Sequence, residues 1–151
     1  MNKLALQPSL KGRALRLLSQ REHSRLELER KLAEHESEPG QLAKALDELQ
    51  ARGFISEERV IESVVHRRAG KLGAARIRQE LQAKGLAGEA VAEALEHLRS
   101  TELARAREVW QRKFGETTAD PKARARQARF LLSRGFAAGV VRQIVQGSED
   151  A

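Results

Sequence analysis

Residue types that commonly carry out catalysis or bind metals occur in this sequence, but their spacing fits no recognised site. The four histidines have neither the HExxH spacing of a zinc-binding helix nor a neighbouring set of carboxylates; they are His23, His35, His66 and His97. Glu93 and His97 lie one helical turn apart, which more often gives a surface pair than two metal ligands. Serine, histidine and aspartate are present, but in no nucleophile setting. The sequence therefore predicts no enzyme, no metal site and no cofactor.

Nucleotide hydrolysis and cysteine chemistry are also not expected. The sequence has no GxxxxGK[ST] loop to cradle phosphates, so any ATP hydrolysis connected with this protein belongs to a partner. With no cysteine there is no disulfide and no thiolate nucleophile, and a reducing compartment is allowed. No apolar run reaches the length of a membrane span, and the first residues lack a secretory signal pattern. We expect a cytoplasmic protein that does not contact membranes.

Basic side chains are the chemistry that the chain does carry. Lys and Arg number 28 against 21 Asp and Glu, a formal net charge of +7 that favours a polyanionic or acidic partner. From Lys122 to Arg134 there are five basic residues and no acidic one, although solvated helix surfaces usually mix both signs. We predict that a contact surface for DNA phosphates or for an acidic protein surface contains the following residues: Arg67, Arg68, Lys71, Arg76, Arg78, Lys84, Lys122, Arg124, Arg126, Arg129 and Arg134.

An exposed charge can also be a solvated surface residue that only pairs with its helix neighbours, and for any single position this is the commoner case. Contact with a partner is the stronger interpretation for Arg76, whereas the two interpretations are equal for Arg68 and Arg124. Aromatic residues make up 3% of the chain, too few for a platform that stacks single-stranded DNA. We expect the aromatic residues of the last third in the core; they are Trp110, Phe114, Phe130 and Phe136.

Three copies of one helical pattern position these side chains. An apolar residue recurs at offsets of 49 and then 50 positions, as Leu32, Leu81 and Leu131. Ten residues later, and again four residues after that, the copies align at these positions: Leu42, Val91 and Val141, then Leu46, Leu95 and Val145. Three copies in register indicate an internal repeat.

Each copy predicts three helices, because apolar residues recur at the 3.6-residue period of an α-helix. Ser24 with Glu27 forms a capping box, and Asp120 before a proline marks another helix start. In the central copy Ile77 and Leu81 lie on one side of a helix, with the basic residues elsewhere. The expected fold is all-α, with three tandem three-helix repeats in an elongated body, straight or curved. The predicted repeats cover residues 1–54, 55–99 and 100–151.

Four stretches of sequence, taken together and in order, resemble a known family. They read HisSer at 23–24 with LeuGluArgLysLeu at 28–32; GlyPheIleSerGluGluArg at 53–59; ArgIleArgGlnGluLeu at 76–81 with LysGly at 84–85; and ArgPheLeuLeuSerArgGlyPhe at 129–136. The family is RecX, the regulators of the RecA recombinase. The resemblance implies an all-helical protein of three three-helix repeats that binds the RecA filament on DNA and restrains its ATPase, strand-exchange and coprotease functions.

One stretch departs from the family pattern. The family usually has a Gly-aromatic-Gly-Pro turn before the central helix, where this chain has Lys71, Leu72, Gly73 and Ala74. The turn is therefore expected to be less rigid than in the family.

The expected partners are the RecA filament and single- or double-stranded DNA, which a monomer would contact through phosphates. Two other classes of function stay open at this stage. A helix-turn-helix regulator would use residues 74–84 as its recognition helix and would bind a specific palindrome as a dimer. A DNA-independent helical scaffold would bind its partner without nucleic acid and with little salt dependence.

Overall fold

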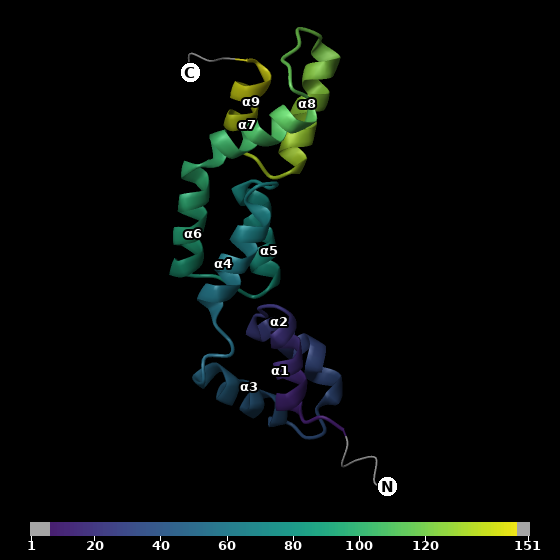
Figure 1. Ribbon diagram of the computed structural model, residues 1–151, viewed down its shortest axis with the longest axis vertical. Helices are drawn as coiled ribbons and strands as arrows, with labels where there is room; N and C mark the ends of the chain where they lie inside the picture. The colour runs from purple at the N-terminus through teal and green to yellow at the C-terminus, as the bar shows by residue number, and fades with distance from the viewer. Residues whose placement is uncertain (1–6, 148–151) are drawn as a thin grey trace. The chain divides into compact units, whose positions relative to one another are not determined.

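The computed structural model describes residues 7–147, and this part of the chain is helical (Figure 1). It contains nine α-helices and no strand, which confirms the predicted all-α class. The helices are α1 Leu10–Gln20, α2 Arg25–Leu32, α3 Gln41–Ala51, α4 Glu57–Arg68, α5 Ala74–Ala83, α6 Glu89–Ser100, α7 Glu102–Lys113, α8 Pro121–Ser133 and α9 Ala138–Val145. A short 3₁₀-helix, η2 Ala33–His35, directly continues α2.

The apolar positions that align between the three sequence copies are all buried. Leu32, Leu81 and Leu131, for example, lie on α2, α5 and α8, and each is at most 3% exposed. The repeat inferred from the sequence is therefore confirmed by burial, since one position faces the interior in each copy.

The chain divides into two compact units. Of the described residues, the first unit contains 7–63 and 84–86, and the second contains 64–83 and 87–147. Helix α4 begins in the first unit and ends in the second.

In the first unit, α1, α2 and α3 pack against one another in pairs (Figure 1). Two of these helices begin at serine caps. Ser9 Oγ accepts the N–H of Gly12 at 3.0 Å, and Ser24 and Glu27 form the predicted capping box. The hydrophobic core of this unit consists of Leu10, Ala14, Leu28, Leu32, Leu42, Leu46, Leu49 and Ile55.

Glu27 also accepts hydrogen bonds from two cations of the first unit. Its Oε2 lies 2.7 Å from Nη2 of Arg21 and 3.2 Å from Nζ of Lys84, while its Oε1 accepts the N–H of Ser24 at 3.0 Å. Burial alone would raise the pKa of this carboxyl group, but these hydrogen bonds and charges outweigh it and lower the pKa to about 2.

The stability of the chain should therefore depend on pH through Glu27. Because the pKa is about 2 in the folded protein against its usual 4.5, this stabilisation is complete above about pH 4.5 and is lost as the pH falls towards 2. We expect Glu27→Gln to cost about 2 kcal/mol at pH 7 and almost nothing near pH 2. Urea unfolding of both proteins, followed by circular dichroism across this range, measures the difference. A difference that stays constant with pH would contradict the lowered pKa.

In the second unit, α7, α8 and α9 pack together, α5 contacts α6, and α6 contacts α7. Asp120 caps α8 as predicted, with its Oδ1 accepting the N–H of Lys122 at 3.3 Å. The core around the last three helices consists of Ala106, Val109, Trp110, Leu131, Phe136, Val141, Ile144 and Val145.

The predicted aromatic core is only partly correct. Trp110 and Phe136 are buried, whereas Phe114 and Phe130 are half-buried and pack edge to face, with ring centroids 5.6 Å apart. Phe130 packs against the core on one side, and its ring also borders an open cavity, where Lys113 and Arg134 lie against it.

The start of α5 meets the turn between α8 and α9 through bare backbone in the second unit. The N–H of Gly73 donates to the carbonyl of Arg134 at 2.8 Å. A Cβ atom at Gly73 would lie 2.3 Å from the carbonyl oxygen of Gly135, and one at Gly135 would lie 2.7 Å from the nitrogen of Arg76. Both glycines are therefore required by the close approach of two chain segments.

Candidate polyanion-binding site

Two adjoining cavities of the second unit share Lys71 and Arg134 in their walls. Their volumes are about 540 and 570 Å³. We call them together the basic groove, which is lined by Arg68, Gly70, Lys71, Leu72, Arg76, Gln79, Glu80, Val109, Arg112, Lys113, Phe130 and Arg134. These residues come from the end of α4, the following turn, α5, α7 and α8.

Two arginines of α7 hold the turn between α4 and α5. Arg105 Nη1 donates to the carbonyls of Ala69 and Leu72 at 2.8 and 2.7 Å, and Arg112 Nη2 donates to the carbonyl of Gly70 at 2.9 Å. The turn lacks the aromatic and proline residues of the family pattern, but these bonds give three of its carbonyls fixed partners. They also leave the side chain of Lys71 exposed at the groove.

Phe130 brings two further cations to the groove wall. The Lys113 ammonium lies 5.1 Å from the centre of the Phe130 ring, and the Arg134 guanidinium lies 4.8 Å from it. Both distances are within the range of cation–π attraction, which places positive charge beside a ring without requiring a carboxylate.

The groove has one carboxylate, Glu80, and two arginines already engage it. Arg68 Nε donates to Glu80 at 2.9 Å, and Arg67 Nη2 lies 3.7 Å from its other oxygen. Within residues 7–147, Lys71 and Lys113 form no ion pair with any acidic group. The groove therefore keeps an excess of positive charge that a polyanion can neutralise.

The structure brings four of the predicted contact residues to the groove and places Arg67 beside it; the four are Arg68, Lys71, Arg76 and Arg134. Arg76 is partly engaged within the fold, because its Nη1 donates to the carbonyl of Ser133 at 2.6 Å, near the end of α8.

The other predicted contact residues lie elsewhere. Arg78 lines a separate hollow in the second unit, Lys84 pairs with Glu27 in the first unit, and Arg124 Nε donates to the carbonyl of Thr118 at 2.5 Å. Three exposed residues of α8, at i, i+4 and i+7 spacing, lie on one side of that helix; they are Lys122, Arg126 and Arg129.

Sequence reasoning missed two cations of the groove, Arg112 and Lys113. The available signal was local, since both follow Trp110 in the last turn of α7 and no acidic residue lies between Glu108 and Glu116. The prediction covered the first helix of the central repeat, with Arg67 and Arg68, but did not extend to α7, the equivalent helix of the third repeat.

Sequence reasoning also missed Glu102, a buried carboxylate that caps two helices. Its Oε1 accepts the N–H of Ala74 at the start of α5, and its Oε2 accepts the N–H of Ala137 before α9, each at 2.8 Å. Arg105 lies 3.7 Å from Oε1. Burial lowers the pKa of the Arg105 guanidinium, and the charge of Glu102 opposes that effect.

The part of the chain that the structure describes has no group of three histidines and carboxylates able to hold a metal ion. Among the same residues, no helix is both long enough and apolar enough to cross a membrane. What the groove offers is a charged surface of lysine and arginine donors.

Comparison with known proteins gives three adjoining matches to models of RecX domains. The first, second and third three-helix domains of RecX match residues 11–49, 56–95 and 100–145. The regulatory protein RecX of Leptothrix cholodnii is 58% identical over 140 residues, which cover 93% of this chain and 89% of the relative. That of Ralstonia nicotianae is 48% identical over 141 residues, with the same coverage of 93% and 89%.

Two solved structures share the fold. The crystal structure of RecX from Lactobacillus salivarius matches with a TM-score of 0.74 at 19% identity, covering 91% of this chain and 93% of the other. A second crystal structure, of regulatory protein RecX, matches with a TM-score of 0.74 at 22% identity and covers 91% and 71% of the two chains.

Proposed function

Because this chain belongs to the RecX family, we propose that it regulates the RecA recombinase by binding the RecA filament on DNA. Binding restrains the ATPase, strand-exchange and coprotease activities of the filament. The relatives carry the name regulatory protein, which supports a regulator rather than an enzyme. In this proposal the protein acts as a cytoplasmic monomer, and DNA is contacted through its phosphates.

The excess positive charge of the basic groove carries the proposal. Lys71, Lys113 and Arg134 border the groove, and its one carboxylate is already held by two arginines. Guanidinium and ammonium groups bind phosphates through charge-assisted hydrogen bonds. A groove of this charge suits the DNA of a nucleoprotein filament better than an apolar protein surface.

The exposed cations of α8 extend the proposed contact beyond the groove. Lys122, Arg126 and Arg129 form no ion pair or side-chain hydrogen bond with residues 7–147, so their donors are available to a partner. Arg76 and Lys84 are weaker probes of function, because replacing either would also remove a contact within the fold.

The structure disfavours α5 as the recognition helix of a transcription regulator. Such helices read bases with residues of their first turns. Here Ala74 is buried, Arg76 binds the carbonyl of Ser133, and Gly73 lies against Gly135. The start of α5 at Gly73 and Ala74 is thus buried within the second unit, and Arg76 is partly engaged by the fold.

The test compares two double variants with the same change in charge. The first carries Lys71→Glu and Arg134→Glu. We expect the concentration of this variant that inhibits ATP hydrolysis by RecA on single-stranded DNA to be at least about 10 times that of wild type. The matched control is Arg107→Glu with Arg142→Glu, which changes two exposed arginines of the same unit outside the groove. The control should inhibit like wild type.

The same titration at two salt concentrations separates the alternatives. Wild-type affinity should fall with salt, and the groove variant should show a weaker dependence because phosphate contacts are lost. Inhibition that does not respond to salt or DNA would favour a protein-binding scaffold. If the folded groove variant inhibits as well as wild type, the groove is not the contact surface; if wild type does not inhibit, the proposed function is wrong.

A further inference from the structure

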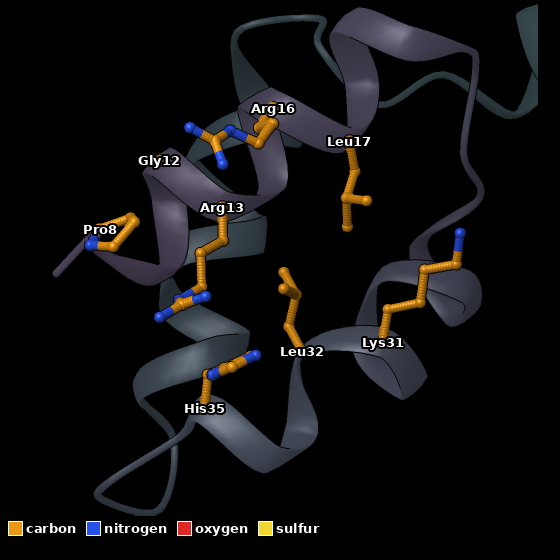
Figure 2. A pocket seen from close by; sticks show the side chains of 8 residues that line it. All are labelled: Pro8, Gly12, Arg13, Arg16, Leu17, Lys31, Leu32 and His35. Atoms are coloured by element: carbon orange, nitrogen blue, oxygen red, sulfur yellow. The ribbon is translucent and has the colours of Figure 1, made fainter.

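A cavity of about 280 Å³ lies in the first unit, between the start of α1 and the end of α2 with η2 (Figure 2). Its wall combines two kinds of side chain. Arg13, Arg16 and His35 are basic, and Pro8, Leu17 and Leu32 are apolar. Lys31 also borders the cavity, but its ammonium group is engaged by Nε2 of buried His23 at 3.1 Å.

The basic side chains of this cavity are gathered without an acidic residue in the wall. Arg13 and Arg16 lie three residues apart and hence on one side of α1, where like charges repel. Neither guanidinium makes an ion pair or hydrogen bond with residues 7–147. Figure 2 shows Arg13 and His35 extending toward one another. Glu34 lies 3.7 Å from His35 Nε2 and forms no ion pair with Arg13 or Arg16, so it does not compensate the repulsion between the two arginines.

An anion bound in the cavity would relieve the repulsion between Arg13 and Arg16. The cavity also opens beside the first turn of α1, and the positive end of that helix dipole favours negative charge. Two arginine side chains supply the planar donors that suit phosphate oxygens.

The apolar part of the cavity points to more than an inorganic anion. Leu17 and Leu32 both line the cavity, and Figure 2 shows them pointing toward one another from α1 and α2; we call them the leucine floor. Leu32 is a core residue, so the part of this floor that water reaches is mainly Leu17. A phosphate ion would leave that part in contact with water, whereas a ligand with an attached ring system would cover it. We propose that the cavity binds a nucleoside phosphate, with its phosphate at Arg13 and Arg16 and its base over the two leucines.

The ligand is either a free nucleotide or one nucleotide of single-stranded DNA, since both present the same chemistry. All the residues that would contact it belong to the first unit, whereas the basic groove belongs to the second. The site can therefore be tested on the protein alone, without RecA, and its failure would leave the proposed regulation of RecA untouched.

The first experiment titrates the full-length, isotope-labelled protein with dAMP and, separately, with inorganic phosphate. We expect dAMP to shift the amide resonance of Gly12 and the methyl resonances of Leu17 and Leu32, and to bind more tightly than phosphate. Arg13→Gln with Arg16→Gln should weaken dAMP binding at least tenfold. The control, Lys44→Gln with Arg52→Gln, removes the same charge from exposed residues of the first unit and should bind like wild type.

Two results would overturn the proposal. The first is equal binding of dAMP by wild type and by the Arg13→Gln, Arg16→Gln variant, with both proteins shown to be folded by circular dichroism. This result would mean that the two arginines do not bind the phosphate. Binding of dAMP no tighter than that of inorganic phosphate would show that the leucine floor takes no part.

The second experiment distinguishes the two sources of the ligand. A short oligothymidylate is titrated into the Lys71→Glu, Arg134→Glu protein, in which the groove has lost two cations. Shifts of the Gly12 and leucine resonances with this DNA would identify single-stranded DNA as the source, and shifts with dAMP alone would identify a free nucleotide. No shift with either ligand would refute the site.

Discussion

Replacing Gly135 by alanine should lower the free energy of unfolding of the second unit by about 3 to 5 kcal/mol. Gly135 has a φ of +90°, a conformation that costs an alanine about 1 to 2 kcal/mol. The added Cβ would also lie 2.7 Å from both the backbone nitrogen and the Cβ of Arg76, closer than such atoms approach in proteins. Because the Arg76 nitrogen belongs to the backbone, a change of side-chain rotamer cannot remove this clash. Removing it requires moving α5 away from the turn before α9.

Two further alanine variants separate the two causes. Gly73→Ala adds only the close contact, with its Cβ 2.3 Å from the carbonyl oxygen of Gly135. Gly115→Ala adds only the unfavourable φ, which is +79° with the nearest atom at an ordinary 3.6 Å. Trp110, the single tryptophan of the chain, lies in the second unit, so its fluorescence in urea reports this unit's unfolding. If Gly135→Ala costs no more than Gly115→Ala, the two backbones do not meet as described.

Features that depend on residues near in sequence could be predicted from it. The capping box at Ser24 needs only a carboxylate three residues later, and the N-cap at Asp120 needs only the next turn of its own helix. The buried faces follow from the helical period repeated in three copies, so Leu32, Leu81 and Leu131 could be assigned to the interior before their neighbours were known.

Features that depend on residues distant in sequence could not be predicted from it. The repeat aligns Gln127 with Leu28 and Ile77, and Gln127 is buried like them although its side chain is polar. Its Oε1 accepts the indole N–H of Trp110 at 3.0 Å, and its Nε2 donates to the carbonyl of Glu116 at 3.3 Å. The partner on α7 is 17 residues away, and only the packing of α7 against α8 reveals it.

The candidate site shows the same division. Lys71 and Arg134 were predicted as contact residues from charge alone, but their meeting in one groove depends on the packing of segments far apart in the chain. Spacing also could not show that Arg76 reaches the carbonyl of Ser133, 57 residues away, and is therefore partly structural. The sequence thus indicates which residues are basic and exposed, whereas the fold decides which of them form one surface.

Glu102→Ala should destabilise the second unit by about 3 to 5 kcal/mol. The substitution leaves the N–H groups of Ala74 and Ala137 without their acceptor, and it leaves the partly buried Arg105 without its only acidic partner among residues 7–147. The residue before α9 is an alanine and provides no side-chain cap, so Glu102 serves the starts of two helices at once.

Glu102→Gln tests whether both carboxylate oxygens are needed. A glutamine keeps the shape but places an NH₂ group opposite one of the two backbone N–H groups, so we expect a loss of about 2 to 3 kcal/mol. Glu108→Ala, an exposed change on the same helix, should cost less than about 0.5 kcal/mol. Trp110 fluorescence in urea gives the stabilities, and hydrogen exchange of Ala74 and Ala137 shows whether both helix starts loosen. Equal costs for Glu102→Ala and Glu108→Ala would mean that the carboxylate does not hold these helices, because an exposed glutamate loses only solvent contacts whereas a buried one leaves two donors unpaired.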